Sequence, residues 1–366
     1  MKRFISIIFA VALAMGSAIA NDGLVATPAS TSKVVFTGRT QTDGESVSFD
    51  WSGVYMRIRF EGRYFAMSVS DTQKNYFNVW LDKDSSETPD KVIATFGSDS
   101  LIVVFDETEL KGKAPHDVLI QRRTEGNLGI TTIHKFYTQK PLLQADAPKD
   151  RLIEFIGDSY TCGYGTENSI FSDTFKPETE NCNYAYGPII ARYFDADYIL
   201  VSHSGKGIVR NYADGEGPCM PELYLRTFDL QESPAWKADG KKPDLTVIYL
   251  GTNDFSEGKQ PGMSEWNGAY AKLLNEVKAN YGENHPILCI ASFADEFTLD
   301  YVRNAVMSSG LGNVYYMALT NGICNGDDDL GASWHPNYKG QKKKAYAIIP
   351  YISTITGWAL KDGDVR

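Results

Sequence analysis

Four residues spread along the chain carry groups that could cooperate in nucleophilic catalysis. Residues 153–165 read Ile-Glu-Phe-Ile-Gly-Asp-Ser-Tyr-Thr-Cys-Gly-Tyr-Gly, so Ser159 stands where a buried strand is predicted to end. Further along come Gly205 in Ser-His-Ser-Gly-Lys-Gly, Asn253 in Leu-Gly-Thr-Asn-Asp and His335 in Ser-Trp-His-Pro. A strand-to-helix turn exposes a side chain at the carboxyl edge of a sheet, where α/β proteins bind ligands. A serine there becomes a nucleophile only if a base and oxyanion donors converge on it.

Ser159 also has two simpler interpretations. A serine after a strand is an ordinary first residue of a helix, where its hydroxyl caps a backbone N–H. Gly163 and Gly165 resemble part of a phosphate loop, but no Gly-Lys-Ser/Thr sequence follows them. The Gly-Asp-Ser context, taken with the partners downstream, favours the nucleophile.

His335 is the best candidate base among the five histidines. It follows a loop rich in Gly and Asp and precedes Pro336, so its backbone is restrained while its ring can face the sheet edge. The alternative is a structural histidine. His116 and His134 lie in the N-terminal half, and His285 precedes a proline in a predicted loop ahead of a strand. His203 stands close to Gly205 and is interpreted as structural.

Gly205 and Asn253 fit the donors of an oxyanion hole. A glycine after a strand brings its backbone N–H close to a substrate with no Cβ in the way. An asparagine amide offers a neutral, directional N–H to a developing negative charge. The alternative for Asn253 is a turn-forming Asn-Asp pair that closes the strand.

Two halves of the chain differ in hydrophobic period. Residues 30–143 show short runs with alternating apolar residues, beginning with residues 56–60 and 65–69, which are predicted to form a hairpin around Glu61-Gly62. About eight to ten such strands without a convincing amphipathic helix predict a β-sandwich of the jelly-roll kind. A sugar-binding role and a supporting role both remain open for this half.

The period changes after residues 144–150. The later half has five unbroken apolar runs, typical of parallel strands buried on both faces, at residues 152–156, 198–201, 245–250, 287–292 and 314–319. Helical patterns separate them, and the clearest has an apolar stripe over residues 266–281. The sequence therefore predicts a three-layer α/β domain with its site along one sheet edge. The expected organisation is a leader at 1–20, a β-sandwich at 21–145 and an α/β domain at 146–366.

The first twenty residues are predicted to be an export signal. Lys2 and Arg3 precede a short apolar run, and Ala18-Ile19-Ala20 fits a cleavage site. The formal charge of −10 becomes −12 when the two basic residues Lys2 and Arg3 are removed. Such an acidic protein is a poor candidate for binding nucleic acid or an anionic membrane. We expect a secreted or periplasmic protein without a membrane anchor, acting on a neutral substrate.

The five cysteines permit disulfides in an exported protein without requiring them. Cys289 stands in an apolar run and is expected to pack as a small hydrophobic residue. Cys162 and Cys182 bracket a polar loop after Ser159, so this pair ranks first for a disulfide. None of the cysteines has the C-x-x-C spacing of a zinc site, and no metal site is predicted.

The four motifs resemble those of the SGNH (GDSL-like) hydrolase superfamily. The run from Gly157 to Gly165, together with an upstream β domain, is similar to carbohydrate esterase family 2. The resemblance covers nearly all of the chain after the leader, and it implies a jelly-roll domain joined to an SGNH domain that removes acetyl groups from plant polysaccharides without a cofactor. It implies Ser159 as the nucleophile, His335 as the base, and the Ser159 N–H, the Gly205 N–H and the Asn253 side chain as the oxyanion hole. Cleft aromatics in that family stack on sugar, and the matching residues here are Tyr212 and Trp334.

One position departs from the superfamily pattern. Members usually carry an aspartate three residues before the histidine, where this chain has Ala332. We therefore expect His335 to work without a side-chain acid, with Ser333 or a neighbouring carbonyl as its partner, or with a weak acid recruited from Asp327, Asp328 or Asp329.

Three functions are compatible with these residues. The first is an acetyl esterase that acts on acetylated xylan, glucomannan or derived oligosaccharides. The second is an SGNH lipase or thioesterase, which would want an apolar acyl groove, whereas residues 166–183 are polar. The third is a catalytically weak carbohydrate-binding protein, against which the joint presence of Ser159, Asn253 and His335 argues. The oligomeric state is left open by the sequence.

Overall fold

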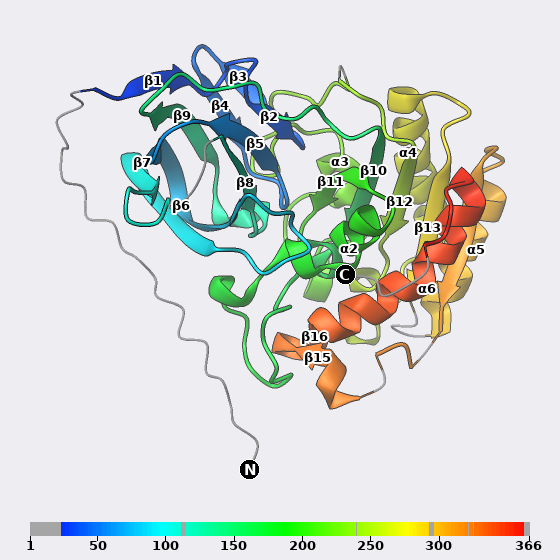
Figure 1. Ribbon diagram of the computed structural model, residues 1–366. Coiled ribbons are helices and arrows are strands. Elements are labelled where there is room, and N and C mark those ends of the chain that lie inside the picture. Colours follow the sequence, from blue (N-terminus) through cyan, green and yellow to red (C-terminus); the bar gives the residue numbers. More distant parts are fainter. Residues whose placement is uncertain are drawn as a thin grey trace.

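The computed structural model describes residues 23–110, 115–238, 240–292, 296–320, 322–324 and 326–361. The predicted leader at residues 1–20 lies outside this range. Two sheets stand side by side, an antiparallel sheet from the first part of the chain and a parallel sheet from the second (Figure 1). The chain passes from one to the other between Thr138 and Arg151.

The first sheet contains nine strands in antiparallel pairs and forms what is called the β domain below. Its central order is β2-β5-β8-β6-β9-β4-β3, with β1 on β9 and β7 on β6. The strands are β1 (Val25–Pro28), β2 (Val35–Thr37), β3 (Gln41–Asp43), β4 (Ser46–Phe49), β5 (Tyr55–Phe60), β6 (Phe65–Leu81), β7 (Lys91–Phe105), β8 (His116–Arg122) and β9 (Thr131–Thr138).

The hairpin predicted from residues 56–69 is wrong in its pairing. β5 pairs with β2 and β8, whereas β6 pairs with β7, β8 and β9. The two strands meet through their side chains instead, with the rings of Phe60 and Phe65 stacked at 5.2 Å between centroids. The alternation of apolar and polar residues identifies the buried face of each strand, but it does not specify with which other strand that strand pairs.

The second sheet is parallel, in the order β11-β10-β12-β13-β14, and with its helices forms the α/β domain. All five predicted apolar runs are confirmed as its strands: β10 (Arg151–Gly157), β11 (Ala196–Ser202), β12 (Leu245–Tyr249), β13 (Ile287–Ser292) and β14 (Val314–Leu319). The first strand in the sequence lies between the next two, so the strand order reverses at β10. A parallel sheet binds ligands at such a switch point, beyond the carboxyl ends of the strands.

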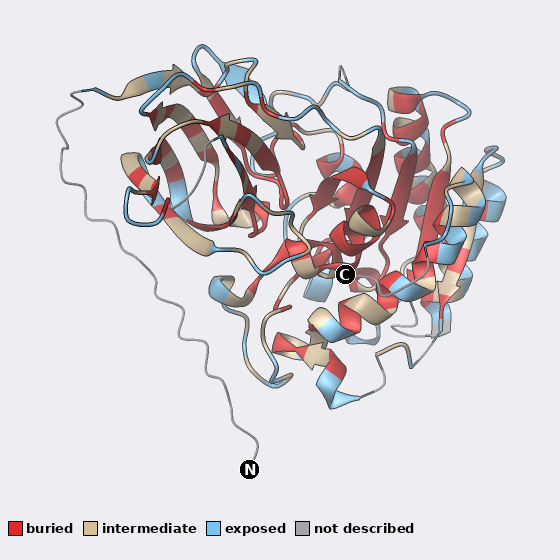
Figure 2. Ribbon diagram, viewed as in Figure 1, coloured by how far each residue is buried: buried red, intermediate tan, exposed pale blue. Residues whose placement is uncertain are grey.

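Helices cover both faces of the parallel sheet, whose strands β10, β11 and β12 are almost wholly buried, whereas the edge strand β14 is partly exposed (Figure 2). Phe155 packs with residues of α2 and α6, whereas Ile156, its neighbour, packs in the cluster that contains Trp266 of α4. This explains the unbroken apolar runs, because successive side chains of a strand point to opposite faces. The α-helices are α1 (Ser159–Cys162), α2 (Tyr186–Tyr193), α3 (Met220–Leu223), α4 (Met263–Tyr281), α5 (Glu296–Ser308) and α6 (Tyr338–Thr356).

Short 3-10 turns and a two-residue ribbon complete the described elements. The ribbon consists of β15 (Leu330–Gly331) and β16 (His335–Pro336). The 3-10 turns are η1 (Gly126–Leu128), η2 (Pro177–Thr179), η3 (Cys182–Tyr184), η4 (Tyr212–Asp214), η5 (Asn253–Gly258), η6 (Asp327–Asp329) and η7 (Ala332–Trp334). Among the described helices, none has the length and apolar character needed to cross a membrane.

Arg39 joins the two domains through a fully buried side chain. It follows β2, and its guanidinium donates to the carbonyl oxygens of Tyr224 and Arg226 at 2.5 and 2.8 Å. It also lies 3.4 Å from the carboxylate of Glu154, in the centre of β10. The ring of Trp236 covers the guanidinium at 4.8 Å. A buried charge is tolerated only when it is paired and hydrogen-bonded, and Arg39 meets both conditions.

We predict that Arg39→Ala lowers the free energy of unfolding by about 3–5 kcal/mol, because it leaves Glu154 buried without its cation. Urea denaturation of the full chain measures the change. The matched control is Arg303→Ala, which removes an exposed partner of Asp300 and should change stability by less than about 1 kcal/mol. Equal stability of the two variants would show that Arg39 does not hold the domains together.

Candidate active site

Three of the predicted site residues lie at the carboxyl ends of three neighbouring strands. Ser159 follows β10, while Gly205 and Asn253 follow β11 and β12, which flank it. The turn into α1 is tight, since a Cβ at Gly157 would stand 2.0 Å from the Thr161 Oγ1 atom. Asp158 caps α1 by accepting from the Tyr160 N–H at 3.1 Å. The capping role therefore belongs to Asp158 rather than to Ser159.

His335 reaches the same point from the C-terminal part of the chain. Its Nε2 lies 2.8 Å from Ser159 Oγ, and its Nδ1 lies 2.9 Å from the carbonyl oxygen of Ser333. A carbonyl oxygen only accepts, so Nδ1 carries the hydrogen and Nε2 is left to accept from the serine hydroxyl. This is the tautomer that a general base for Ser159 needs.

The loop before His335 has an unusual backbone conformation. Ser333 and Trp334 have φ angles of 52° and 57°, in the left-handed region that side chains other than glycine rarely adopt. Two further hydrogen bonds hold the loop, from the N–H of Ser333 to the oxygen of Asp173 at 2.8 Å and from the N–H of Trp334 to the oxygen of Phe171 at 3.0 Å. The resulting turn directs the Ser333 carbonyl at the ring two residues later.

The partner of His335 is thus a backbone carbonyl, as one of the sequence alternatives expected. The acids considered as substitutes are engaged elsewhere or exposed. Asp329 pairs with Lys343 at 2.6 Å, Asp328 lies 3.7 Å from Lys339, and Asp327 is exposed. Ala332 is fully buried at the position where the superfamily has its aspartate.

Aromatic rings enclose the imidazole of His335. Tyr164 lies 4.2 Å from it between centroids, Tyr160 lies 5.6 Å away, and Phe175 stacks on Tyr164 from the other side. Burial lowers the pKa of His335, the Ser333 carbonyl opposes this by raising it, and the charge of Lys344 lowers it further. At neutral pH the ring is therefore neutral and able to accept a proton.

The Asn253 amide points into the site but already has partners. It donates to the Lys206 carbonyl oxygen at 2.9 Å and to the Asp158 carboxylate at 3.2 Å. To donate to a substrate, it must share or release one of these bonds. By contrast, among the residues that the structure describes, none accepts a hydrogen bond from the backbone N–H of Ser159 or Gly205. Gly205 has a φ of 80°, a conformation that favours glycine.

Asp254 is a structural member of the site that the sequence analysis missed. Its buried carboxylate accepts from the N–H groups of Ile208, Val209 and Arg210 at 2.8–3.0 Å. Burial raises its pKa to about 6, although the three N–H groups lower it. The contact ties the chain after Gly205 to the chain after Asn253. The Asn-Asp pair was visible in the sequence, but its partners were not.

The two aromatic residues expected to bind sugar border the site. Tyr212 and Trp334 are 59% and 62% exposed, so both rings are accessible to a ligand. The Tyr212 N–H donates to the Gly205 oxygen at 2.8 Å, so this ring stands beside the oxyanion glycine. Trp334 precedes His335 and contacts Phe171 at 5.8 Å. Phe171 was not identified from the sequence.

The disulfide expected between Cys162 and Cys182 is absent, and both thiols are free and buried. The Cys162 Sγ is directed at Glu125 and Ser202 instead, and the Cys182 Sγ at the Arg122 carbonyl. Bracketing a loop therefore did not imply that the two sulfur atoms face each other. Cys289 is buried in the core, as expected.

One group of described residues has the composition of a metal site. Possible ligand atoms of Glu125, Cys162 and Glu180 lie within 4.8 Å of one another. Burial raises the pKa of the Cys162 thiol and of the Glu180 carboxyl, with further increases from the neighbouring acidic groups. Metal ligands must be deprotonated, so a cation bound here would have to displace the proton of the Cys162 thiol.

The fold and the site define the class of this protein. Residues 155–343 match the GDSL-like lipase/acylhydrolase family, and the chain belongs to that family. Residues 36–148 match the N-terminal domain of carbohydrate esterase 2. A structure of a family two carbohydrate esterase from Clostridium thermocellum in complex with cellohexaose superposes with a TM-score of 0.80 at 27% identity, covering 89% of this chain and 100% of that one.

Two relatives in sequence carry descriptions of their activity. The cellulase/esterase CelE of Acetivibrio thermocellus is 29% identical over 334 residues, 89% of this chain but only 40% of CelE. The chain thus spans less than half the length of that relative. An acetylxylan esterase/glucomannan deacetylase of Cellvibrio japonicus is 28% identical over 326 residues, covering 85% of this chain and 87% of the relative.

We predict that His335 titrates below 6.5, its ordinary pKa, because its ring is buried and lies near Lys344. Because protonation gives the imidazole ring a positive charge, a lowered pKa means that His335 stays neutral until the pH falls below that pKa. NMR of the ring carbons and nitrogens against pH measures it. In Lys344→Met the pKa should rise, because one positive charge is removed. A pKa at or above 6.5 in the unmodified protein would contradict the prediction.

Proposed function

We propose that this protein is an exported serine esterase that removes acetyl groups from a hemicellulose, such as acetylated xylan or glucomannan, or from oligosaccharides derived from it. The observation that carries the proposal is the 2.8 Å contact between Ser159 Oγ and His335 Nε2, with Nδ1 held by a carbonyl. The relatives described above support the choice of substrate. No metal or organic cofactor enters the reaction.

In the first half of the reaction, Ser159 Oγ attacks the acetyl carbonyl carbon while its proton passes to His335 Nε2. The carbonyl oxygen becomes an alkoxide and accepts from the N–H groups of Ser159 and Gly205, for which no described residue is the acceptor. Asn253 joins them by giving up its longer bond, the one to Asp158. The carbon–oxygen bond to the sugar then breaks, and the sugar oxygen takes the proton from His335.

In the second half, water attacks the acetyl-serine ester and gives its proton to His335. The same donors bind the second alkoxide, and its collapse returns the proton of His335 to Ser159 Oγ and releases acetic acid, which loses its own proton to the solvent as acetate. The Ser333 carbonyl holds the ring in the required tautomer through both steps, but it carries only a dipole to oppose the imidazolium charge. The buried position of the ring keeps it uncharged between steps.

The surroundings of the site suit a neutral sugar. Tyr212 and Trp334 present exposed rings beside the reacting atoms, and such rings pack against the apolar faces of pyranoses. Most of residues 166–183 are polar, and Phe171 and Phe175 of this loop pack against Trp334 and Tyr164. These features favour a short acyl group on a carbohydrate.

We predict that Ser159→Ala lowers the rate constant for acetate release from acetylated xylan or glucomannan by at least about 10³-fold, as loss of a nucleophile does in serine hydrolases. The hydroxyl stands at a strand end, so the melting temperature should change little. Acetate release followed by NMR gives both the rate and the position that is deacetylated. Retention of more than a few per cent of the rate would reject the nucleophile.

The alternative of a lipase or thioesterase makes a different prediction. A series of 4-nitrophenyl esters from acetate to decanoate should show activity limited to the shortest acyl groups if the first proposal holds. Equal or rising activity toward long chains would instead favour the alternative. Calorimetric titration with glucan and mannan, run with Ser159→Ala, tests whether carbohydrate binding is the main activity.

A further inference from the structure

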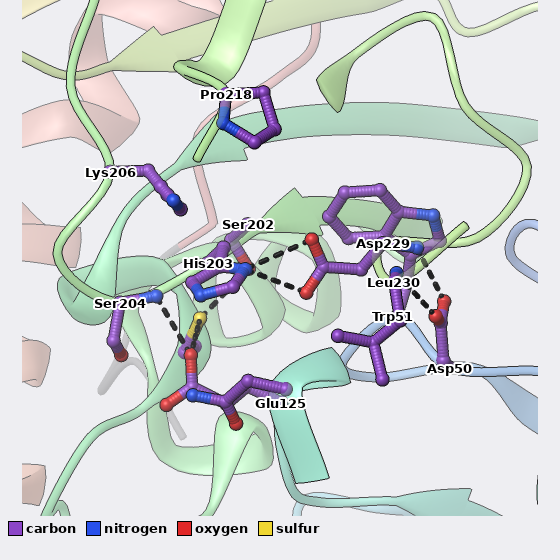
Figure 3. A network of polar contacts seen from close by, with 12 residues as sticks. Asp50, Trp51, Glu125, Ser202, His203, Ser204, Lys206, Pro218, Asp229 and Leu230 are labelled. Atoms are coloured by element: carbon purple, nitrogen blue, oxygen red, sulfur yellow. Dashed lines mark hydrogen bonds and ion pairs between the residues drawn. The ribbon is translucent and has the colours of Figure 1, made fainter. Parts of the chain in front are cut away.

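The segment that carries the oxyanion glycine is held by carboxylates of other segments (Figure 3). Glu125 lies between β8 and η1 of the β domain and is 1% exposed. Its Oε2 accepts a hydrogen bond from the Ser204 N–H at 2.7 Å. Ser204 immediately precedes Gly205, so the β domain reaches to within one residue of a proposed catalytic donor.

The same oxygen of Glu125 contacts the other side of the site. The Cys162 thiol donates to Oε2 over 3.6 Å, and Cys162 is the last residue of α1, the helix that starts at Ser159. One carboxylate therefore touches both segments that supply backbone N–H groups to the oxyanion hole. Ser202, at the end of β11, completes the contact by lying 3.3 Å from the same sulfur.

A second link supports the same segment from a different direction. Asp50, which follows β4, accepts from the N–H groups of Asp229 and Leu230 at 2.9 and 3.1 Å. The Asp229 carboxylate lies 2.7–2.9 Å from Nδ1 of His203. His203 thus keeps the structural role expected from the sequence. In Figure 3 its ring points toward Asp229, while Glu125 points toward the Ser204 backbone.

These contacts bear on catalysis because peptide units are rigid. The Ser204 N–H and the Gly205 N–H belong to consecutive peptide units that are separated only by the φ and ψ angles of Ser204, so fixing the first unit limits the positions open to the second. A misplacement of about 1 Å in a catalytic group can reduce a rate about 10²-fold. A hydrogen bond to a carboxylate is roughly twice as strong as one between neutral groups, which suits Glu125 to hold this peptide in place.

We propose that Glu125 of the β domain is a positioning residue that sets the geometry of the oxyanion hole in the α/β domain. The inference rests on the proposed function, since it takes Gly205 and Ser159 as the donors. It assigns the β domain a part in the chemistry beyond packing. Glu125 touches neither substrate nor the reacting atoms, and it acts through Ser204 and Cys162.

Asp197 provides a matched control. It is also a buried carboxylate at the contact between the domains, accepting from Tyr55 at 2.7 Å and pairing with Arg57. It lies near the start of β11, whereas Ser204 follows the end of the same strand. Asp197→Asn therefore weakens the domain contact without touching the site.

The test compares Glu125→Ala, Glu125→Gln and Asp197→Asn in the full chain, with 4-nitrophenyl acetate as substrate. We expect Glu125→Ala to lower kcat about 10²-fold with KM nearly unchanged, because the geometry of the transition state suffers most. Glu125→Gln keeps an acceptor for the Ser204 N–H and should lose only about tenfold, since the bond is no longer charge-assisted. Asp197→Asn should lower the melting temperature and leave kcat near that of the unmodified protein.

A second measurement, the affinity for a boronic acid, tests the geometry of the oxyanion hole without catalytic turnover. Phenylboronic acid forms a bond from boron to Ser159 Oγ, the serine proton passes to His335, and a boron-bound oxygen occupies the oxyanion position. Its Kd should rise in Glu125→Ala by about the factor that kcat loses, as expected for a transition-state analogue, and stay constant in Asp197→Asn. If Glu125→Ala does not fold, the kcat and the boronate Kd of Glu125→Gln test the positioning role instead.

The outcomes separate this inference from the proposed function. If Glu125 variants match Asp197→Asn in both kcat and boronate affinity, the inference is overturned, whatever the natural substrate is. If nitrophenyl acetate is hydrolysed but acetylated polysaccharides are not, the proposed substrate falls and the positioning role is still measured. If no ester is turned over, the boronate affinities alone decide the positioning role.

Discussion

Buried charged side chains at the contact between the two domains fix how the domains are joined. Arg39 enters the α/β domain to meet Glu154 in the middle of its sheet, and Glu125 enters it to meet the backbone beside Gly205. A buried charge without partners costs several kcal/mol, so these contacts fix the relative position of the domains more narrowly than apolar packing would. The site therefore belongs to both domains, although its strands come from one.

The second organising feature is the hydrogen bond from Nδ1 of His335 to a backbone carbonyl oxygen, which stands in place of a side-chain acid. Two left-handed residues, Ser333 and Trp334, turn the chain so that the carbonyl of the first meets the ring of His335. The same turn leaves Trp334 exposed beside the site. Strained backbone of this kind persists only where surrounding contacts hold it, and here it fixes a tautomer and presents an aromatic ring at once. A side-chain acid would add electrostatic stabilisation that a carbonyl dipole does not match.

The predictions from sequence succeeded where a pattern reflects a local rule and failed where distant segments had to be matched. The five parallel strands were predicted from unbroken apolar runs, because strands buried on both faces carry apolar residues at successive positions. The pairing of β5 with β6 and the bridge between Cys162 and Cys182 were wrong, since neither alternation nor spacing states which partner a strand or a sulfur meets. Asp254 and Glu125 were overlooked for the same reason: their partners are backbone N–H groups, which no side chain in the sequence marks.

From the sequence alone, the family was identified through its motifs, and the change from a β domain to an α/β domain and the site residues Ser159, Gly205, Asn253 and His335 were predicted. These follow from residue types at strand ends, where local geometry and chemistry coincide. Three features became clear only from the tertiary structure. They are the order of neighbouring strands, the carbonyl oxygen that accepts from His335, and the carboxylates that accept from backbone N–H groups beside the site. Those features depend on contacts between distant segments, such as Ser159 and His335, which are 176 residues apart, and Arg39 and Arg226, which are 187 residues apart. Such contacts form only when the whole chain packs and excludes water, because a buried polar group then needs a hydrogen-bond partner within the protein.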